Sequence, residues 1–284
     1  MTGFLEGRTE LADGRLVDIG DVEVWCHDTG GDGEPLLLLG GPSVGHFHFD
    51  FVRPYLGDHR LVTWEPRGFG PSGRDGRPYS VDVWAADLEG LLDALGVERG
   101  HVWANAFSSY IGFAFAAAFP ERLGALVSYT DVWAADPAKG YAGAWEAYRE
   151  IIGAHGTRGE GAARLARLYA LTDPPWFTDW FELSVAEVLH ADTAAQTIGY
   201  FCTEADVRDR LADVRAPLLV LLGDRSWDGS PLDTRIDPSL DLIRGHIPAA
   251  EVATLHAHPV HLIIQEPEQA AAIVRRFLAA HPLA

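Results

Sequence analysis

The amino-acid sequence predicts a mostly parallel, doubly wound α/β sheet with a helical insertion. Short, continuous apolar runs recur along the chain, and such runs are typical of strands buried on both faces. Segments with apolar residues at helical spacing lie between these runs. Two strand signals at the start of the chain form a hairpin instead of alternating with helices. This succession predicts a parallel sheet covered by helices and opened by an antiparallel pair.

The predicted strands are apolar runs that end at turn residues. Residues 15–19 and 22–26 flank Gly20-Asp21, which suits a tight turn. Residues 35–39, with the sequence Pro-Leu-Leu-Leu-Leu, lead directly into Gly40-Gly41-Pro42. Further buried strands are expected at residues 60–64, 101–104, 125–129, 217–222 and 252–255.

Helices are predicted in the intervals between the strands. Ser80 is a suitable N-cap and Gly96 a suitable stop for a helix with one apolar stripe. Residues 107–119 predict a second helix, which Pro120 ends. The last helix is expected to begin near Pro267, because proline is favoured in a first turn.

One long segment interrupts the alternation of strand and helix. Residues 133–210 contain no buried strand signal. We therefore expect a core of residues 1–132 and 211–284 and a helical cap of residues 133–210. An insertion between sheet strands projects from the strand ends, where α/β proteins bind ligands. Helical spacing within the cap occurs at residues 144–152, 162–169 and 176–181.

Composition and charge exclude several classes of function. The net charge of −19 argues against binding to nucleic acid or to anionic membranes, because both would repel the chain. No apolar run reaches the roughly 18 residues of a membrane span, and the N-terminus lacks the apolar core of a signal peptide. We therefore expect a cytoplasmic protein that acts on a small molecule. The sequence leaves the oligomeric state open, a homodimer included.

No metal or cofactor is expected. Cys26 and Cys202 fit neither a metal nor a redox spacing, so they are expected to be buried thiols. His46 and His48 suggest a pair of metal ligands, but no third ligand follows at a recognisable spacing. A pocket-lining or surface role is favoured for both histidines, and we expect them to contact substrate. No cofactor-binding motif occurs.

Four motifs point to a known superfamily. Gly40-Gly41-Pro42 follows the third strand, and residues 65–72 read Glu-Pro-Arg-Gly-Phe-Gly-Pro-Ser after the fourth. Residues 95–123 contain a strand, a tight turn of small residues and a helix. His258-Pro-Val-His precedes the last helix. Together, over essentially the whole chain, these motifs resemble the α/β-hydrolase superfamily, and the Gly-Gly-Pro turn is similar to that of proline iminopeptidases. The resemblance implies an oxyanion hole formed by the backbone N–H groups of Gly41 and Phe107.

The nucleophile position departs from the family pattern. The family's elbow reads Gly-x-nucleophile-x-Gly, whereas residues 104–108 read Ala-Asn-Ala-Phe-Ser and place Ala106 in the nucleophile slot, beside Asn105 as an expected substrate contact. Pro120 lies fourteen residues after Ala106, as in the family. The alternative register makes Ser108 the nucleophile but puts Tyr110 where glycine is needed. A methyl group cannot attack a carbonyl, so Ala106 excludes covalent catalysis at this position.

The catalytic acid is also displaced. Where the family has Gly-x-x-Asp, this chain has Ser226 in the last place. Haloalkane dehalogenases and certain cofactor-free dioxygenases take the acid from the end of the preceding strand, and Asp131 fits that position. Asp131 is therefore favoured, with Asp228 and Asp224 as alternatives.

His258 is the favoured base, and His261 is a second candidate. A carboxylate that accepts a hydrogen bond from Nδ1–H of His258 would leave Nε2 free to take a substrate proton.

The cap is rich in aromatic residues. Packing within the cap is the favoured explanation of the cluster at residues 176–181, although Trp133, Trp176 and Trp180 are expected to contact substrate. Leu39 stands where many relatives have histidine. An apolar or aromatic ligand is therefore expected.

Three functions are consistent with the sequence. The favoured one is a His–Asp general acid–base enzyme for a small carbonyl compound, acting without a covalent nucleophile by lyase chemistry, cyclisation, non-covalent hydrolysis or cofactor-free oxygenation. The second is an ester, amide or lactone hydrolase of the serine type whose nucleophile is replaced by Ala106. The third is a non-catalytic ligand-binding protein. The number of departures from the family pattern, at Leu39, Ala104, Ala106, Ser108 and Ser226, favours natural divergence over a single engineered substitution.

Overall fold

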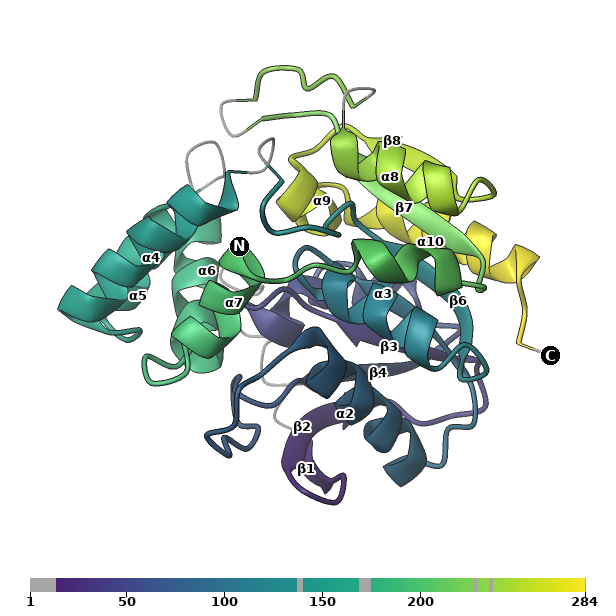
Figure 1. Ribbon diagram of the computed structural model, residues 1–284, viewed down its shortest axis with the longest axis horizontal. Coiled ribbons are helices and arrows are strands. Elements are labelled where there is room, and N and C mark those ends of the chain that lie inside the picture. Colours follow the sequence, from purple (N-terminus) through teal and green to yellow (C-terminus); the bar gives the residue numbers. More distant parts are fainter. Residues whose placement is uncertain (1–13, 137–139, 169–174, 227–228, 235–236, 284) are drawn as a thin grey trace.

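An eight-stranded sheet forms the centre of the computed structural model (Figure 1). Its strand order is β1-β2-β4-β3-β5-β6-β7-β8. The first three strands in this order pair antiparallel, and the remaining pairs are parallel. The structure describes residues 14–136, 140–168, 175–226, 229–234 and 237–283, without the side chains of residues 175 and 176.

The sequence analysis predicted all eight strands. The observed ends lie within about two residues of the predicted ones. Continuous burial along the central strands explains their unbroken apolar runs, because helices cover both faces of the sheet. The strands are β1 (Arg15–Asp18), β2 (Glu23–Asp28), β3 (Pro35–Leu39), β4 (Arg60–Glu65), β5 (Gly100–Ala104), β6 (Leu123–Ser128), β7 (Leu218–Gly223) and β8 (Glu251–Leu255).

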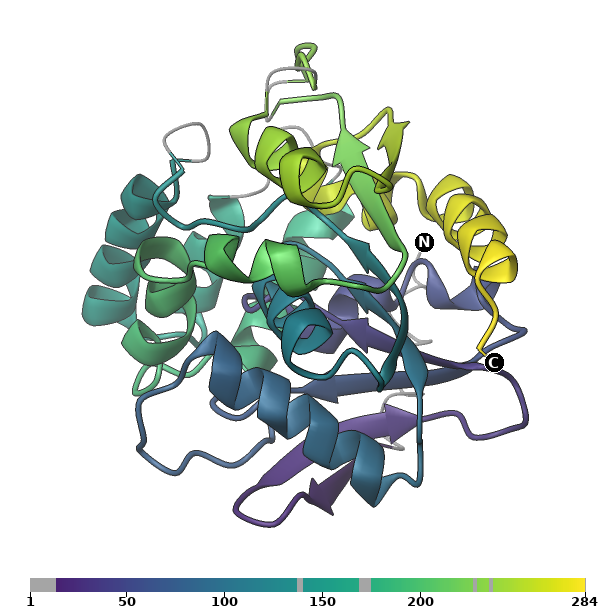
Figure 2. The ribbon, with the colours of Figure 1, turned by 45° about the vertical axis from the view of Figure 1, so that its right-hand side comes forward.

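Helices cover the two faces of the sheet (Figure 2). Helices α2 (Val81–Ala94) and α3 (Ser108–Ala118) pack against each other on one face, and α10 (Pro267–Ala280) lies on the other. The Ser80 side chain accepts a hydrogen bond from the Val83 N–H at the start of α2, so the predicted N-cap is confirmed. Helix α8 (Pro238–His246), which the sequence analysis did not predict, precedes β8.

The segment between β6 and β7 is helical, as predicted. Helices α4 (Tyr141–His155), α5 (Glu160–Arg167) and α6 (Pro175–Val188) form a group at one side of the sheet, with the short α7 (Tyr200–Thr203) beside them (Figure 1). In the described part of residues 133–210, the only β pairing is an isolated bridge between Trp133 and Asp206. The 3₁₀ turn Arg208–Asp213 crosses the expected boundary of the cap.

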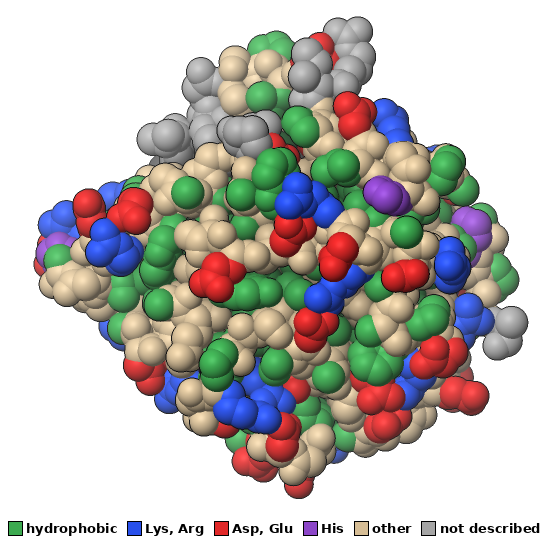
Figure 3. Space-filling view, in the orientation of Figure 1, with side chains coloured by type: hydrophobic (Ala, Val, Ile, Leu, Met, Phe, Trp, Pro, Cys, Tyr) green, Lys and Arg blue, Asp and Glu red, His purple; other side chains and the backbone are tan. Residues whose placement is uncertain are grey.

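Charged side chains of both signs are interspersed on the face shown in Figure 3, with no broad basic patch. None of the helices in the described ranges has the length and apolar character needed to cross a bilayer. Cys26 and Cys202 are both buried and unbonded, which confirms the prediction of buried thiols.

Candidate active site

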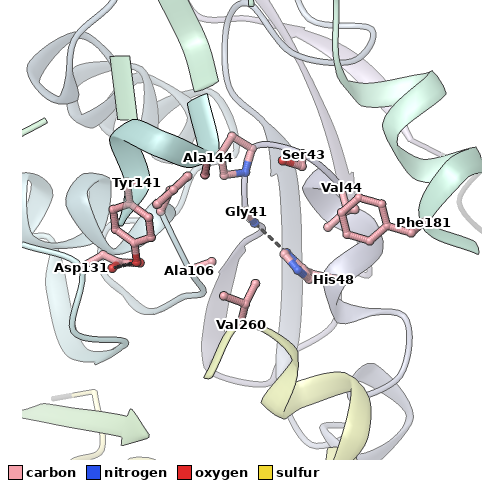
Figure 4. Close-up of a pocket in the computed structure, with 12 residues that line it drawn as sticks. Gly41, Ser43, Val44, His48, Ala106, Asp131, Tyr141, Ala144, Phe181 and Val260 are labelled. Carbon is pink, nitrogen blue, oxygen red and sulfur yellow. Dashed lines mark hydrogen bonds between the residues drawn. The ribbon is translucent and has the colours of Figure 1, made fainter. Parts of the chain in front are cut away.

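A cavity lies between the carboxyl ends of the central strands and the cap (Figure 4). Its volume is about 120 Å³, which is somewhat below the roughly 150 Å³ of an apolar cavity that binds benzene. Most of its walls are apolar, so the cavity suits a small molecule with one ring or a short carbon skeleton. The lining residues are Gly41, Pro42, Ser43, Val44, His48, Ala106, Phe107, Asp131, Tyr141, Ala144, Phe181 and Val260.

Ala106 occupies the turn between β5 and α3 and lines the cavity. Its φ angle is +50°, and it is the only non-glycine residue with positive φ in the described part of the chain. This left-handed conformation costs a residue with a Cβ roughly 1–2 kcal/mol. A strained turn between a strand and a helix is the conformation that the predicted nucleophile elbow requires, and the residue at its tip carries a methyl group.

Gly41 lies next to Ala106, but its N–H group is already engaged. It donates a hydrogen bond to Nδ1 of His48 over 2.9 Å (Figure 4). The prediction that the Gly41 N–H faces a substrate oxygen is therefore wrong for this structure, because an imidazole fills the position in front of it. A Cβ on Gly41 would lie 2.8 Å from that ring, so the close approach requires glycine.

His48 is neutral in this position. It is 3% exposed, and burial is the main cause that lowers its pKa from 6.5 to about 3. Since Nδ1 accepts the hydrogen bond from Gly41, the ring proton lies on Nε2. Of the predicted substrate contacts whose side chains the structure describes, only His48 lines the cavity.

Phe107 provides the other expected oxyanion donor. No hydrogen bond within the described residues uses its backbone N–H. Ser108, the first residue of α3, donates its hydroxyl hydrogen bond to the carbonyl of Gly40 and so ties the elbow to the end of β3. Ser108 is thus committed to the backbone, which supports Ala106 as the residue in the nucleophile position.

Asp131 lines the cavity, three residues beyond the end of β6. Its Oδ1 accepts a hydrogen bond from the hydroxyl of Tyr141, the first residue of cap helix α4 (Figure 4). The Tyr141 ring also packs edge-on against Phe107, with ring centroids 4.6 Å apart. Burial and the nearby Asp131 raise the pKa of Tyr141 well above 10, so this phenol stays protonated.

The other candidate acids are elsewhere or outside the described residues. Asp224 lies 3.5 Å from Arg225 and 3.4 Å from His256, in ion pairs near the surface. Ser226 is 2.6 Å from Ser230, hydroxyl to hydroxyl. Asp228 lies outside the described residues. Of Asp131 and Asp224, the two candidate acids that the structure describes, only Asp131 lines the cavity.

His258 lies in the turn that follows β8 and is 7% exposed. Its Nδ1 accepts a weak hydrogen bond of 3.3 Å from the N–H of Val260, which lines the cavity. The sequence analysis expected a carboxylate at Nδ1 instead. His261 is fully buried, with its ring centroid 5.3 Å from that of His258. The pairing of His258 with Asp131 stays a prediction.

Four predicted substrate contacts do not lie in the cavity wall. His46 is held by Glu65, which binds both its ring and its backbone N–H. Asn105 is buried within the elbow and pairs with β3 through its backbone N–H. Trp133 lies 4.1 Å beneath the guanidinium of Arg208, and Trp180 is buried among aromatic rings.

Packing therefore explains most of the aromatic residues of the cap, as the sequence analysis favoured. Phe177 and Trp180 are fully buried. Their neighbour Phe181 lines the cavity. The side chain of Trp176 lies outside the described residues.

Sequence reasoning missed several residues of the cavity wall. Tyr141 and Ser43 belong to no motif, whereas Phe181 lies in the aromatic cluster and Val260 in the histidine motif, where neither was singled out. The one available signal for Tyr141 was its position at the start of the cap, directly after a glycine and ten residues from Asp131. No group of three metal-ligating side chains occurs among residues for which the structure gives positions.

Comparisons with known proteins agree with the fold. Residues 36–151 match the family model of the α/β hydrolase fold. A putative carbamate hydrolase of Azorhizobium caulinodans is 31% identical over 218 residues, which cover 71% of this chain and 76% of that protein. A 2-hydroxy-6-oxo-2,4-heptadienoate hydrolase of Pseudomonas putida is 38% identical over 119 residues, or 40% of this chain and 43% of that protein.

A solved structure extends the likeness to the whole fold. An esterase of Exiguobacterium antarcticum superposes with a TM-score of 0.78. The match covers 94% of this chain and 99% of the esterase at 15% identity. At this identity the likeness concerns the fold alone.

Proposed function

This chain is an enzyme of the α/β-hydrolase family, and from that premise we propose that it converts a small apolar or aromatic carbonyl compound by general acid–base catalysis at His258 and Asp131, without a covalent nucleophile. The observation that carries the proposal is Ala106, whose methyl group faces the cavity from a turn with nucleophile-elbow geometry. A reaction that needs only proton transfers remains open to such a site.

In the proposed reaction, Nδ1 of His258 gives up the weak hydrogen bond from the Val260 N–H and carries the ring proton instead, so that Nε2 takes a proton from an acidic C–H or O–H of the substrate. The negative charge that develops on the substrate oxygen is stabilised by the Phe107 N–H. The negative charge of Asp131 stabilises the positive charge that His258 acquires with the substrate proton. Carbon–carbon cleavage, elimination, cyclisation, attack by an activated water and direct reaction with O₂ all begin with such a step. The proposed chemistry uses no cofactor.

The walls of the cavity support the proposed substrate class. Val44, Phe181 and Val260 present apolar surface, and Phe107 presents an aromatic ring. The named substrates of the relatives supply concrete test compounds: 2-hydroxy-6-oxo-2,4-heptadienoate and simple carbamates. The acidic net charge supports a small-molecule substrate over nucleic acid.

The test is a turnover assay on a panel of these compounds and of p-nitrophenyl esters. For any compound that the protein converts, His258→Ala is expected to lower kcat/KM by roughly 10²- to 10⁴-fold, the usual contribution of a general base. His256→Ala is the matched control, because His256 is an exposed histidine of the same segment. Equal turnover by wild type and His258→Ala would contradict the proposal.

A second candidate function is a serine-type hydrolase that lacks its nucleophile. The positive φ of Ala106 favours this second function. The strained conformation that a nucleophile elbow needs is present, although an alanine side chain cannot act as a nucleophile. The Ala106→Ser variant distinguishes between the two candidate functions. A burst of product with p-nitrophenyl esters in this variant alone supports the second candidate, whereas unchanged activity supports acid–base catalysis.

A further inference from the structure

We infer that the hydroxyl of Tyr141, held by Asp131, is the acceptor for a phenolic or enolic O–H group of the substrate and relays its proton to Asp131. The inference deepens the proposed function and rests on it, because it names the substrate group that the same cavity binds. Tyr141 comes from the cap and Asp131 from the core, so the cavity is complete only where these two parts meet.

The direction of one hydrogen bond makes the Tyr141 hydroxyl an acceptor toward the substrate. The Tyr141 hydroxyl donates its single proton to Oδ1 of Asp131 (Figure 4). A phenolic oxygen whose proton is engaged has only lone pairs to offer, so it acts as an acceptor toward any further partner. Because Tyr141 lines the cavity, a ligand that matches this wall must bring a donor.

The position of Tyr141 is well defined. Its ring packs edge-on against Phe107 at 87°, next to the elbow. Gly140, in the left-handed conformation, precedes it and turns the chain into helix α4. A residue fixed from both sides presents its oxygen at a constant place, and this is what selectivity for a hydroxyl group requires.

The remaining polar groups of the wall offer few alternatives. The Ser43 hydroxyl pairs with the hydroxyl of Tyr148 over 2.9 Å. Nδ1 of His48 is taken by Gly41, which leaves the Nε2–H of His48 as a donor. Asp131 also lines the cavity, and its Oδ1 is engaged by Tyr141. The Phe107 N–H is a donor and so suits a substrate carbonyl oxygen. The cavity therefore combines a donor for a carbonyl oxygen with an acceptor for a hydroxyl.

The proton transfer balances without any further reactant. The substrate O–H bond breaks as its proton moves to Oη of Tyr141, and the phenolic proton moves to Oδ1 of Asp131. The negative charge passes from the carboxylate to the substrate oxygen. Tyr141 stays neutral throughout, which its pKa well above 10 allows.

The acidity of the substrate decides whether this transfer is accessible. An ordinary carboxyl group and a simple phenol differ in pKa by about six. A hydroxyl conjugated with a carbonyl group is more acidic than a simple phenol, so the relay favours such a substrate for turnover. Simple phenols are expected to bind at the same acceptor without losing their proton.

The test compares the binding of phenol with that of toluene, which has the same shape but a methyl group in place of the hydroxyl. Calorimetric titration of the full chain is expected to show that Tyr141→Phe weakens phenol binding about tenfold or more, since hydrogen bonds within charged networks contribute effects of this size. Toluene binding stays within about twofold. Tyr200→Phe is the matched control, because it removes a tyrosine hydroxyl from the cap whose partner, the Val81 N–H, lies outside the cavity wall.

A double variant tests whether the two residues act as one relay. If they do, Tyr141→Phe combined with Asp131→Asn loses no more phenol affinity than the more damaging single change. Additive losses would show independent contacts and overturn the relay. Phenol binding that Tyr141→Phe leaves unchanged, or no detectable binding of phenol to wild type, would overturn the acceptor role.

These outcomes are separate from those of the turnover assay. Loss of phenol selectivity in Tyr141→Phe supports the acceptor even if His258→Ala leaves turnover unchanged, in which case the acid–base mechanism alone fails. Conversely, a large effect of His258→Ala together with unchanged phenol binding in Tyr141→Phe overturns the inference and leaves the proposed function in place.

Discussion

The two sides of the cavity differ in the chemistry that they present (Figure 4). On one side, Ala106 offers a methyl group, and the Gly41 N–H is occupied by the His48 ring. On the other side, Asp131 and Tyr141 form a hydrogen-bonded pair of ionisable side chains. A serine-type hydrolase combines a nucleophile with a group that moves protons. In this chain the elbow side has a turn suited to a nucleophile but no nucleophilic atom. The other side has two ionisable side chains, Asp131 and Tyr141, that can transfer protons.

The largest expected effect comes from breaking the elbow side at Gly40. A Cβ at this position would lie 1.7 Å from the carbonyl oxygen of Gly45, and backbone cannot yield as a flexible side chain does. Gly40→Ala is therefore expected to lower the free energy of unfolding by about 3 kcal/mol or more. Urea denaturation measures this change. Gly57→Ala is the control, because a Cβ there meets no atom within 4 Å; equal stability of the two variants would contradict the packing of this side.

The next effect concerns the dependence of stability on pH. His48 has a pKa of about 3 in the folded protein and about 6.5 when unfolded. Between these values the unfolded chain binds the extra proton, so the contribution of His48 is complete above pH 6.5 and is lost as the pH falls toward 3. The expected loss is about 1.4 kcal/mol per pH unit.

His48→Asn removes this titration while keeping an acceptor for the Gly41 N–H. Urea denaturation of both proteins between pH 7 and pH 4.5 measures the difference. The curves should diverge below about pH 6.5, with the wild type losing stability faster. Parallel curves over this range would show that His48 is not held neutral.

A smaller effect is expected on the side of Asp131. Tyr141→Phe removes one hydrogen bond to a carboxylate while the ring continues to pack against Phe107. A loss of about 1.5–3 kcal/mol is usual for a hydrogen bond to a charged group. We expect the lower end of that range, measured by thermal or urea unfolding, because the ring contact is retained. A loss above the range would indicate that the phenol also maintains the packing of the cap.

The smallest effect comes from relaxing the elbow itself. Ala106→Gly relieves the cost of a Cβ at φ +50° but adds conformational freedom to the unfolded chain. The two terms nearly offset, so we expect a net stabilisation below about 1 kcal/mol. A clear destabilisation in urea would mean that the methyl group contributes to packing against Gly41. The two residues are close, since a Cβ added to Gly41 would lie 3.3 Å from the Ala106 methyl group.

The regular parts of the fold were predictable from local patterns. The apolar run at residues 35–39 matches β3 residue for residue, because burial on both faces requires a continuous apolar strand. Ser80 was recognisable as an N-cap from its residue type and position. The position of Ala106 in the elbow followed from its spacing to Pro120, and its positive φ agrees with that register. Helix α8 was missed, since its short amphipathic segment lies among turn residues.

The contacts of the cavity were less predictable. His46 and His48 are two residues apart in one 3₁₀ turn, yet one is held by Glu65 and the other faces Gly41. No periodicity distinguishes the two, because all the residues of this 3₁₀ turn are buried. The aromatic residues of the cap posed the same problem, since a buried ring and a ring at a cavity wall require the same residue type.

The sequence by itself determined the strands, most helices, the place of the cap and the absence of an attacking atom at residue 106, since burial, turn chemistry and residue type act locally. The tertiary structure alone decided that the Gly41 N–H pairs with His48 and that the Tyr141 hydroxyl meets Asp131. The two residues are seven positions apart in the first pair and ten in the second, and no single helix or strand contains both members of a pair. The direction of such a side chain follows from the packing of sheet against cap, and no local pattern records it.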